Sequence, residues 1–150
     1  MSARTAPPFR ADHVGSLLRP LPLKQARAKR ERGEITSDQL KAVEDREIAA
    51  VIKRQEDIGL KAVTDGEFRR AFWNYDFLSA LDGVEAYLGE RKIKFQDPNP
   101  KPMMLRVVGP LGTFSCHAML EHLKFVAAIT RVTPKMTILW RNARDRGDEF

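Results

Sequence analysis

Residues 36–67, TSDQLKAVEDREIAAVIKRQEDIGLKAVTDGE, decide the fold class because they place a capped helix directly before a short apolar strand. Thr36 and Gln39 have the spacing of a capping box, which predicts that the helix begins there. Apolar residues then recur at near-helical spacing up to a glycine: Leu40, Val43, Ile48, Val51, Ile52 and Ile58. Residues 60–64 (LKAVT) predict a strand that ends in the polar turn Asp65–Glu67.

On both sides of this stretch, the pattern alternates between helix and strand. Residues 9–16 (FRADHVGS) predict a strand, and residues 23–32 predict a helix that two prolines open and Gly33 ends. The remaining predictions are a loop over 68–75, a short helix near 75–82, a hairpin of 91–96 with 103–108, a helix over 115–130 and a strand over 134–139. Strands separated by helices indicate an α/β fold with parallel pairing.

Composition excludes several classes of protein. The chain has 150 residues, of which 43% are hydrophobic and 31% charged, so it is globular rather than disordered. Its single cysteine, Cys116, excludes a disulfide framework and any cysteine-rich zinc fold, and it fits a reducing compartment. No apolar run reaches the roughly 20 residues that span a bilayer, and residues 1–8 lack the apolar core of a signal peptide. We therefore expect a cytoplasmic protein that has no membrane partner.

The net charge of +6 comes mainly from residues 19–32, which hold six basic residues and one acid. Such a helix can contact phosphate groups. However, no aromatic residues interleave with these charges, and no motif that reads DNA or RNA accompanies them. We interpret the segment as a solvated helix face, and a small basic module that binds a polyanion is the alternative.

Ligands of α/β folds bind at the carboxyl ends of strands, and this rule selects two turns. At the first, Gly15 permits a tight turn and a close ligand, and the hydroxyl of Ser16 with nearby N–H groups can hold a carboxylate. A turn locally capped by the serine is the plainer interpretation. At the second, Asp65 and Glu67 can bind an amino group, ligate a metal or act in acid–base chemistry. A solvated turn whose acids pair with the following arginines is equally consistent.

Other polar and aromatic residues carry weaker signals. Cys116, His117 and His122 are possible metal ligands by type, but their spacing does not place them on one helix face, so we predict no metal site from them. His13 stands beside the first turn and either faces a pocket or makes a structural hydrogen bond. The aromatic residues of 68–77 either line a cofactor pocket or pack in the core.

Five motifs in order carry a resemblance to a known family: FRADHVGSLLRP (9–20), VED (43–45), VTDGEFRR (63–70) followed by Trp73, VVGPL (107–111) and TPKMTI (133–138). Together they resemble the cobalamin-independent methionine synthase family. The match is closest to short, single-barrel members that are related to the catalytic C-terminal domain of that enzyme.

The resemblance implies a (β/α)8 TIM barrel and a methyltransferase of methionine biosynthesis that does not use cobalamin. Family members transfer a methyl group from methyltetrahydrofolate polyglutamate to homocysteine, whose thiol a zinc ion activates. By resemblance, Val14, Gly15, Ser16 and Glu67 would hold the amino-acid end of homocysteine. The pocket around them would include His13, Asp65, Arg70 and Trp73.

The chain also departs from the family pattern. No residue matches the family's zinc ligands or its acid–base Asp and His, so no catalytic or metal-binding residue is assigned. A complete barrel needs roughly 200 residues, and residues 139–150 follow no helix or strand pattern. We therefore expect a flexible tail over 1–8, the N-terminal part of a truncated barrel with an inserted hairpin over 9–138, and a divergent tail over 139–150, the product of a truncated or frameshifted reading frame.

Such a partial barrel is expected to be inactive alone, and to associate with itself or with a chain that complements it. Two alternatives remain for the activity. One is a sister chemistry on the same barrel, either a related thiol alkyltransferase or a decarboxylase-like relative. The other is the basic polyanion-binding module.

Overall fold

The computed structural model describes residues 6–7, 13, 15–72, 75–89, 103–112 and 117–138. These belong to two compact units, one formed by 1–71 with 115–137 and the other by 72–114 with 138–150. Several predictions lie outside the described residues, namely most of the strand over 9–16, Val14, Trp73, residues 91–96, Cys116 and the tail over 139–150.

Two helices open the first unit, as the capping and glycine signals predict. Helix α1 spans Leu21–Glu31, with Pro22 in its first turn, where the missing proline N–H costs no hydrogen bond. Helix α2 spans Ser37–Asp57 behind a complete capping box. In this box, the Thr36 hydroxyl accepts a bond of 3.2 Å from the Gln39 N–H, and the Thr36 N–H donates one of 2.8 Å to the Gln39 side chain.

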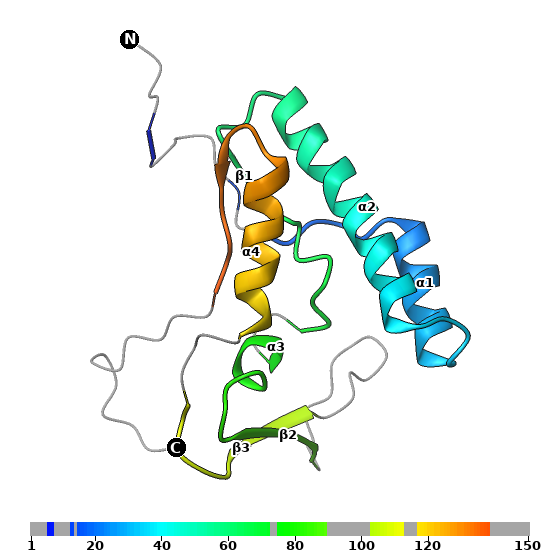
Figure 1. The fold of residues 1–150 in the computed structure, drawn as a ribbon, viewed down its shortest axis with the longest axis vertical. Coiled ribbons are helices and arrows are strands. Elements are labelled where there is room, and N and C mark those ends of the chain that lie inside the picture. Colours follow the sequence, from blue (N-terminus) through cyan, green and yellow to red (C-terminus); the bar gives the residue numbers. More distant parts are fainter. Residues whose placement is uncertain are drawn as a thin grey trace, which may run out of the picture. The chain divides into compact units, whose positions relative to one another are not determined.

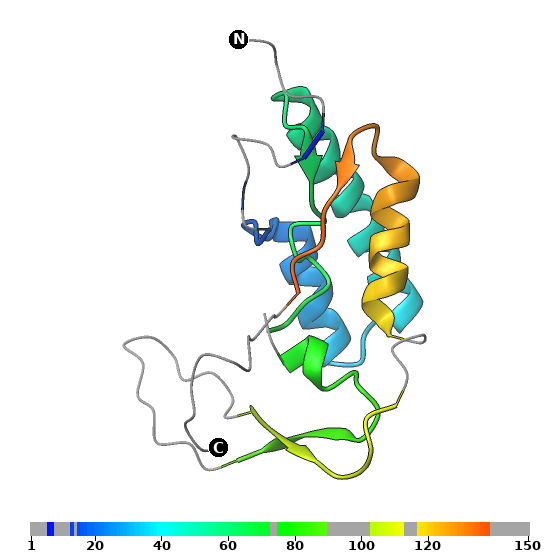
Figure 2. The ribbon, with the colours of Figure 1, turned by 90° about the vertical axis from the view of Figure 1, so that its left-hand side faces the viewer.

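A short parallel sheet joins the two stretches of chain that form the first unit (Figures 1 and 2). Strand β1 is Ala62–Val63 and strand β4 is Thr133–Pro134, and helix α4, Ala118–Ile129, leads into β4. Helix α2 contacts β1, helix α4 contacts β4, and the two helices contact each other. The α/β class and the parallel pairing are therefore confirmed for these strands. No helix in the described parts of the chain is long and apolar enough to cross a membrane.

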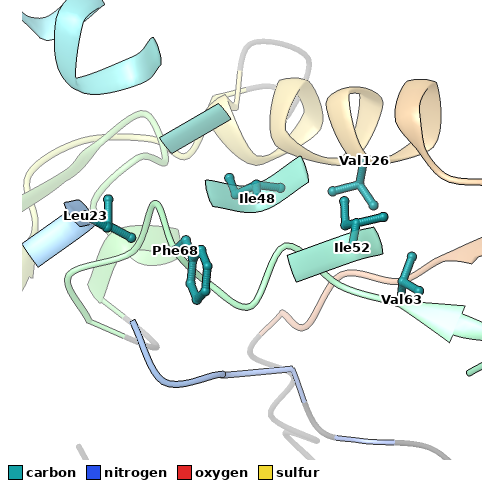
Figure 3. Close-up of a cluster of buried hydrophobic side chains, with 6 residues drawn as sticks. All are labelled: Leu23, Ile48, Ile52, Val63, Phe68 and Val126. Atoms are coloured by element: carbon teal, nitrogen blue, oxygen red, sulfur yellow. The ribbon is translucent and has the colours of Figure 1, made fainter. Parts of the chain in front are cut away.

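The core of this unit comes from every element around the sheet (Figure 3). Six fully buried side chains form it: Leu23, Ile48, Ile52, Val63, Phe68 and Val126. The apolar stripe of α2 supplies two of them, as its spacing predicts. Phe68 comes from the turn after β1, so the core reaches directly beneath the candidate site.

The second unit contains the short helix α3, Tyr75–Leu78, and an antiparallel hairpin. Strand β3, Met103–Val107, lies within the predicted strand over 103–108, but the prediction of its partner is wrong. The partner is β2, Val84–Leu88, rather than residues 91–96. Alternation is a local signal that does not identify a partner, whereas cross-strand contacts do. Glu85 and Arg106 stand opposite each other in the register, with side chains 2.8 Å apart.

Candidate functional site

The two turns that the strand-end rule selects lie against each other in the first unit. The Thr64 hydroxyl, at the end of β1, donates a 3.0 Å hydrogen bond to the carbonyl of Gly15. The Leu17 N–H donates another of 3.0 Å to the carbonyl of Gly66. Gly15 is therefore buried against the carboxyl end of β1, while Ser16 beside it is exposed to solvent.

A third segment, the one that follows β4, meets these turns at Gly15. A Cβ atom on Gly15 would lie 2.3 Å from the Thr137 hydroxyl and 3.5 Å from the Glu67 carboxylate. The backbone of Gly15 also has a φ of +148°, which side chains rarely permit. Only glycine fits here without displacing Thr137, so the carboxyl ends of both parallel strands converge on this position.

Glu67 is buried rather than solvated, which makes the solvated-turn interpretation of Asp65–Glu67 wrong. The residue is 6% exposed, and its φ of +58° is unusual for a residue with a side chain. The Asp65 carboxylate accepts a 2.9 Å bond from the Glu67 N–H and so stabilises this turn. Strained backbone of this kind persists only where surrounding contacts enforce it.

Arg70 is the partner of the Glu67 carboxylate. Its guanidinium lies 3.3 Å from Glu67 Oε1 and also donates a hydrogen bond to the carbonyl of Thr137. Arg70 is 4% exposed, so the pair is shielded from water. A buried carboxylate beside a guanidinium is a polar pair to which a small zwitterion is complementary, because each charge finds an opposite one.

Two arginines of the basic segment point into the protein, which corrects the interpretation of 19–32 as a solvated face. The Arg19 guanidinium donates to the carbonyls of Glu67 and Arg70, at 3.0 and 2.8 Å. The Arg27 guanidinium donates to the carbonyls of Phe68 and Arg70, at 2.5 and 2.9 Å. One signal was available in the sequence, since Arg27 lies four residues after the buried Leu23 and so shares its helix face.

The acids of the VED motif hold the other arginine of the loop. Arg69 donates to Glu44 Oε2 at 3.3 Å and to the Asp45 carboxylate. Glu44 Oε1 also lies 3.6 Å from the Arg27 guanidinium. Burial raises the pKa of Glu44, and the two nearby guanidinium groups oppose that rise. Only Arg70 of the two adjacent arginines pairs with the acids of the turn.

His13 makes a structural hydrogen bond in this arrangement. One ring nitrogen lies 2.7 Å from Gln55 Oε1. Gln55, on α2, also bonds both backbone groups of Thr64, accepting from the N–H at 3.0 Å and donating to the carbonyl at 2.8 Å. Gln55 thereby links α2 to the exit of β1. Sequence patterning missed it, because a polar residue late in a helix carries no signal of burial.

The histidines of the α4 region have other surroundings. His117 caps α4, because its Nδ1 accepts a 3.2 Å bond from the Met119 N–H. His122 lines a groove of about 630 Å³ between α2 and α4, together with Lys41, Arg69 and Phe125. Within the described ranges, no three His, Cys, Asp or Glu side chains gather as a metal site.

We expect the free energy of unfolding of the first unit to decrease as the pH is lowered, because of the lowered pKa of His122. Burial first, and the Arg69 charge second, lower the pKa of His122 below its ordinary value of 6.5. Below that value, the unfolded chain binds a proton that the folded chain does not, so the free energy of unfolding decreases as pH falls. Urea unfolding between about pH 7.5 and about pH 5 should show a smaller loss for His122→Asn than for the wild type. Equal losses would contradict this assignment.

Comparison with known proteins adds independent observations. No family model matches the chain. The uncharacterized proteins YxjH and YxjG of Bacillus subtilis are each 48% identical to it, over 132 and 136 residues. These matches cover 87% and 90% of this chain but only 35% and 36% of the relatives, so the chain spans about a third of their length.

Two further matches carry a described activity or a solved structure. A 5-methyltetrahydropteroyltriglutamate–homocysteine methyltransferase of Thermosynechococcus vestitus is 37% identical over an alignment of 115 residues, and the match covers 68% of this chain and 15% of that one. A crystal structure from Listeria monocytogenes, assigned provisionally as a vitamin-B12 independent methionine synthase, is 40% identical with a TM-score of 0.65. That match covers 82% of this chain and 33% of the other. The chain is thus similar, over most of its length, to proteins of the cobalamin-independent methionine synthase type.

Proposed function

We propose that this chain is part of a methionine-synthase-like (β/α)8 barrel, formed by residues 9–138, and that its two turns bind the amino-acid end of homocysteine. The observation that carries the proposal is the convergence of Gly15, Glu67 and Thr137 at the carboxyl ends of β1 and β4. Ligands of α/β barrels bind at this end of the strands. The similarity to homocysteine methyltransferases supports the choice of substrate.

The chemistry of the turns matches an amino acid. The Glu67 carboxylate is suited to an ammonium group, because a charge-assisted hydrogen bond away from water is strong. The exposed Ser16 hydroxyl and the backbone N–H groups beside it are suited to a carboxylate. Both groups lie next to Gly15, where the two turns and the segment after β4 converge.

The zinc ion of the family does not fit the described residues. The resemblance implies that zinc activates the homocysteine thiol, and two distant relatives are named as homocysteine methyltransferases. Here the ring of His13 contacts Gln55, and His117 caps a helix. No group of metal-binding side chains gathers in the parts of the chain that the structure describes. We therefore assign no step of methyl transfer to these residues.

The alternative of a polyanion-binding module is weakened by the partners of its basic residues. Arg19 and Arg27 donate to carbonyls of the 67–70 loop. Arg30 donates to the Ser37 hydroxyl at 3.0 Å, and Arg32 pairs with Glu34. Because these four guanidinium groups bond to other parts of the chain, the segment presents fewer of them to the phosphate groups of a polyanion.

The proposal predicts that the Glu67→Gln substitution lowers the affinity for L-homocysteine. Losing a buried charged hydrogen bond costs about 1.5–3 kcal/mol, which is roughly a 10- to 150-fold rise in Kd. Titration of the 15N-labelled chain should shift the amide signals of Gly15, Ser16 and Glu67 in the wild type. The exposed carboxylate of Glu121 provides a matched control, and Glu121→Gln should bind like the wild type.

A second ligand tests the group that Glu67 recognises. 4-Mercaptobutyrate keeps the thiol and the carboxylate of homocysteine but lacks the ammonium group. It should bind the wild type as weakly as homocysteine binds Glu67→Gln. Equal binding of homocysteine by wild type and Glu67→Gln, or shifts that map away from the two turns, would contradict the proposal.

A further inference from the structure

Two arginine side chains hold the loop of residues 67–70 in place by hydrogen bonds to its carbonyl oxygens. Carbonyls of three of its four residues, Glu67, Phe68 and Arg70, accept hydrogen bonds from Arg19 and Arg27. The Arg70 carbonyl accepts from both arginines. The arginines lie 41 to 51 residues before the loop in sequence, so these bonds tie α1 and the segment before it to the end of β1.

We infer that Arg27 is a positioning residue for the Glu67 carboxylate, and this inference rests on the proposed role of Glu67 in binding an amino group. The two ends of the Arg27 guanidinium contact the Phe68 and Arg70 carbonyls, so one planar group sets the spacing across the turn. The same turn closes through a 3.0 Å bond from the Arg70 N–H to the Glu67 carbonyl.

We call the two hydrogen bonds from the Arg27 guanidinium to the Phe68 and Arg70 carbonyls the Arg27 clamp. The backbone conformation of Glu67 explains why this clamp is needed. A φ of +58° is disfavoured for glutamate, and the turn would relax to a commoner conformation without restraint. Relaxation would rotate the Cα–Cβ bond and move the carboxylate away from Gly15 and Arg70. The Arg27 bonds to the Phe68 and Arg70 carbonyls restrain the backbone that directly follows Glu67, so they hold its carboxylate in place without touching it.

Glu44 holds the Arg27 guanidinium of this clamp in position through an ion pair. It is buried, and its two oxygens lie 3.6 Å from the Arg27 guanidinium and 3.3 Å from that of Arg69. A single carboxylate therefore orients two arginines, one that holds the loop and one that belongs to it. This gives the VED motif, whose role the sequence leaves unassigned, a place in the site.

The geometry of the clamp requires arginine and not merely a positive charge. Lysine presents one compact ammonium group and cannot span two carbonyls with a planar fork. Arg27→Lys should therefore behave more like Arg27→Met than like the wild type. Arg30 lies on the same helix and bonds the Ser37 hydroxyl instead, so Arg30→Met is the matched control.

The experiment measures three properties of each variant: the intraresidue HN–Hα NOE of Glu67, the Kd for L-homocysteine and the thermal midpoint. The wild type should show a strong NOE, which is typical of positive φ. Arg27→Met and Arg27→Lys should weaken this NOE and raise Kd roughly tenfold or more. Glu44→Gln should shift both in the same direction by less, and Arg30→Met should change neither.

The outcomes separate the inference from the proposed function. If the wild type binds no homocysteine, the proposed function fails, and the Glu67 NOE alone decides the positioning role. A strong NOE retained in Arg27→Met and Arg27→Lys would overturn the inference. If the Arg27 variants do not fold, Glu44→Gln decides it, and an unchanged NOE and Kd in that variant would overturn the inference.

Discussion

Replacing Phe68 with alanine is expected to lower the free energy of unfolding of the first unit by about 3–5 kcal/mol. Phe68 is 2% exposed and packs in the cluster that includes Leu23 and Ile48. The loss combines the transfer of a large apolar side chain with the cavity left behind. Domains of this size are stable by only about 5–15 kcal/mol, so urea unfolding followed by circular dichroism should show a clearly lowered midpoint.

An exposed apolar residue supplies the control for this prediction. Leu18 is 89% exposed, and Leu18→Ala should stay within about 0.5 kcal/mol of the wild type. Phe68→Leu keeps part of the volume and should recover part of the loss. If Phe68→Ala lowered the free energy of unfolding no more than Leu18→Ala, the conclusion that the core extends to the 67–70 loop would be wrong.

Local signals predicted the helices well. The capping box at Thr36 and the prolines at the start of α1 identify where two helices begin, because these signals act within a few residues. Helix α4 lies inside the predicted range of 115–130 for the same reason. The alternation of helix and strand predicted parallel pairing in general, and the structure identifies β1 and β4 as a parallel pair.

The contacts that build the site could not be predicted in this way. Arg19, Arg27 and Gln55 act by bonding backbone groups 9 to 51 residues away, and apart from the spacing of Arg27 to Leu23 no local sequence signal identifies them. Burial of the 65–67 turn likewise depends on Arg70 and on a glycine from another part of the chain. The strand-end rule selected two turns that do contact each other, because it describes topology, whereas the side-chain partners depend on tertiary packing.

Replacing Gly15 with alanine is expected to have the largest effect of any substitution at the site. The new Cβ would lie 2.3 Å from the Thr137 hydroxyl, and the φ of +148° adds backbone strain. Overpacking and strain each cost about 1–3 kcal/mol, so we expect a total loss of about 2–6 kcal/mol in urea unfolding. The segment after β4 should also move, which would change the amide signals of Thr137 and Glu67.

Gly33 allows the two costs to be separated. Its φ is +75°, and a Cβ there would meet no atom within 4 Å, so Gly33→Ala measures strain without overpacking. We expect about 1 kcal/mol for that variant. Adding Thr137→Ala to Gly15→Ala removes the hydroxyl and should recover most of the overpacking cost, a coupling that a double-mutant cycle measures. If Gly15→Ala and Gly33→Ala cost the same, or Thr137→Ala recovers nothing, the three segments do not converge at Gly15 as described.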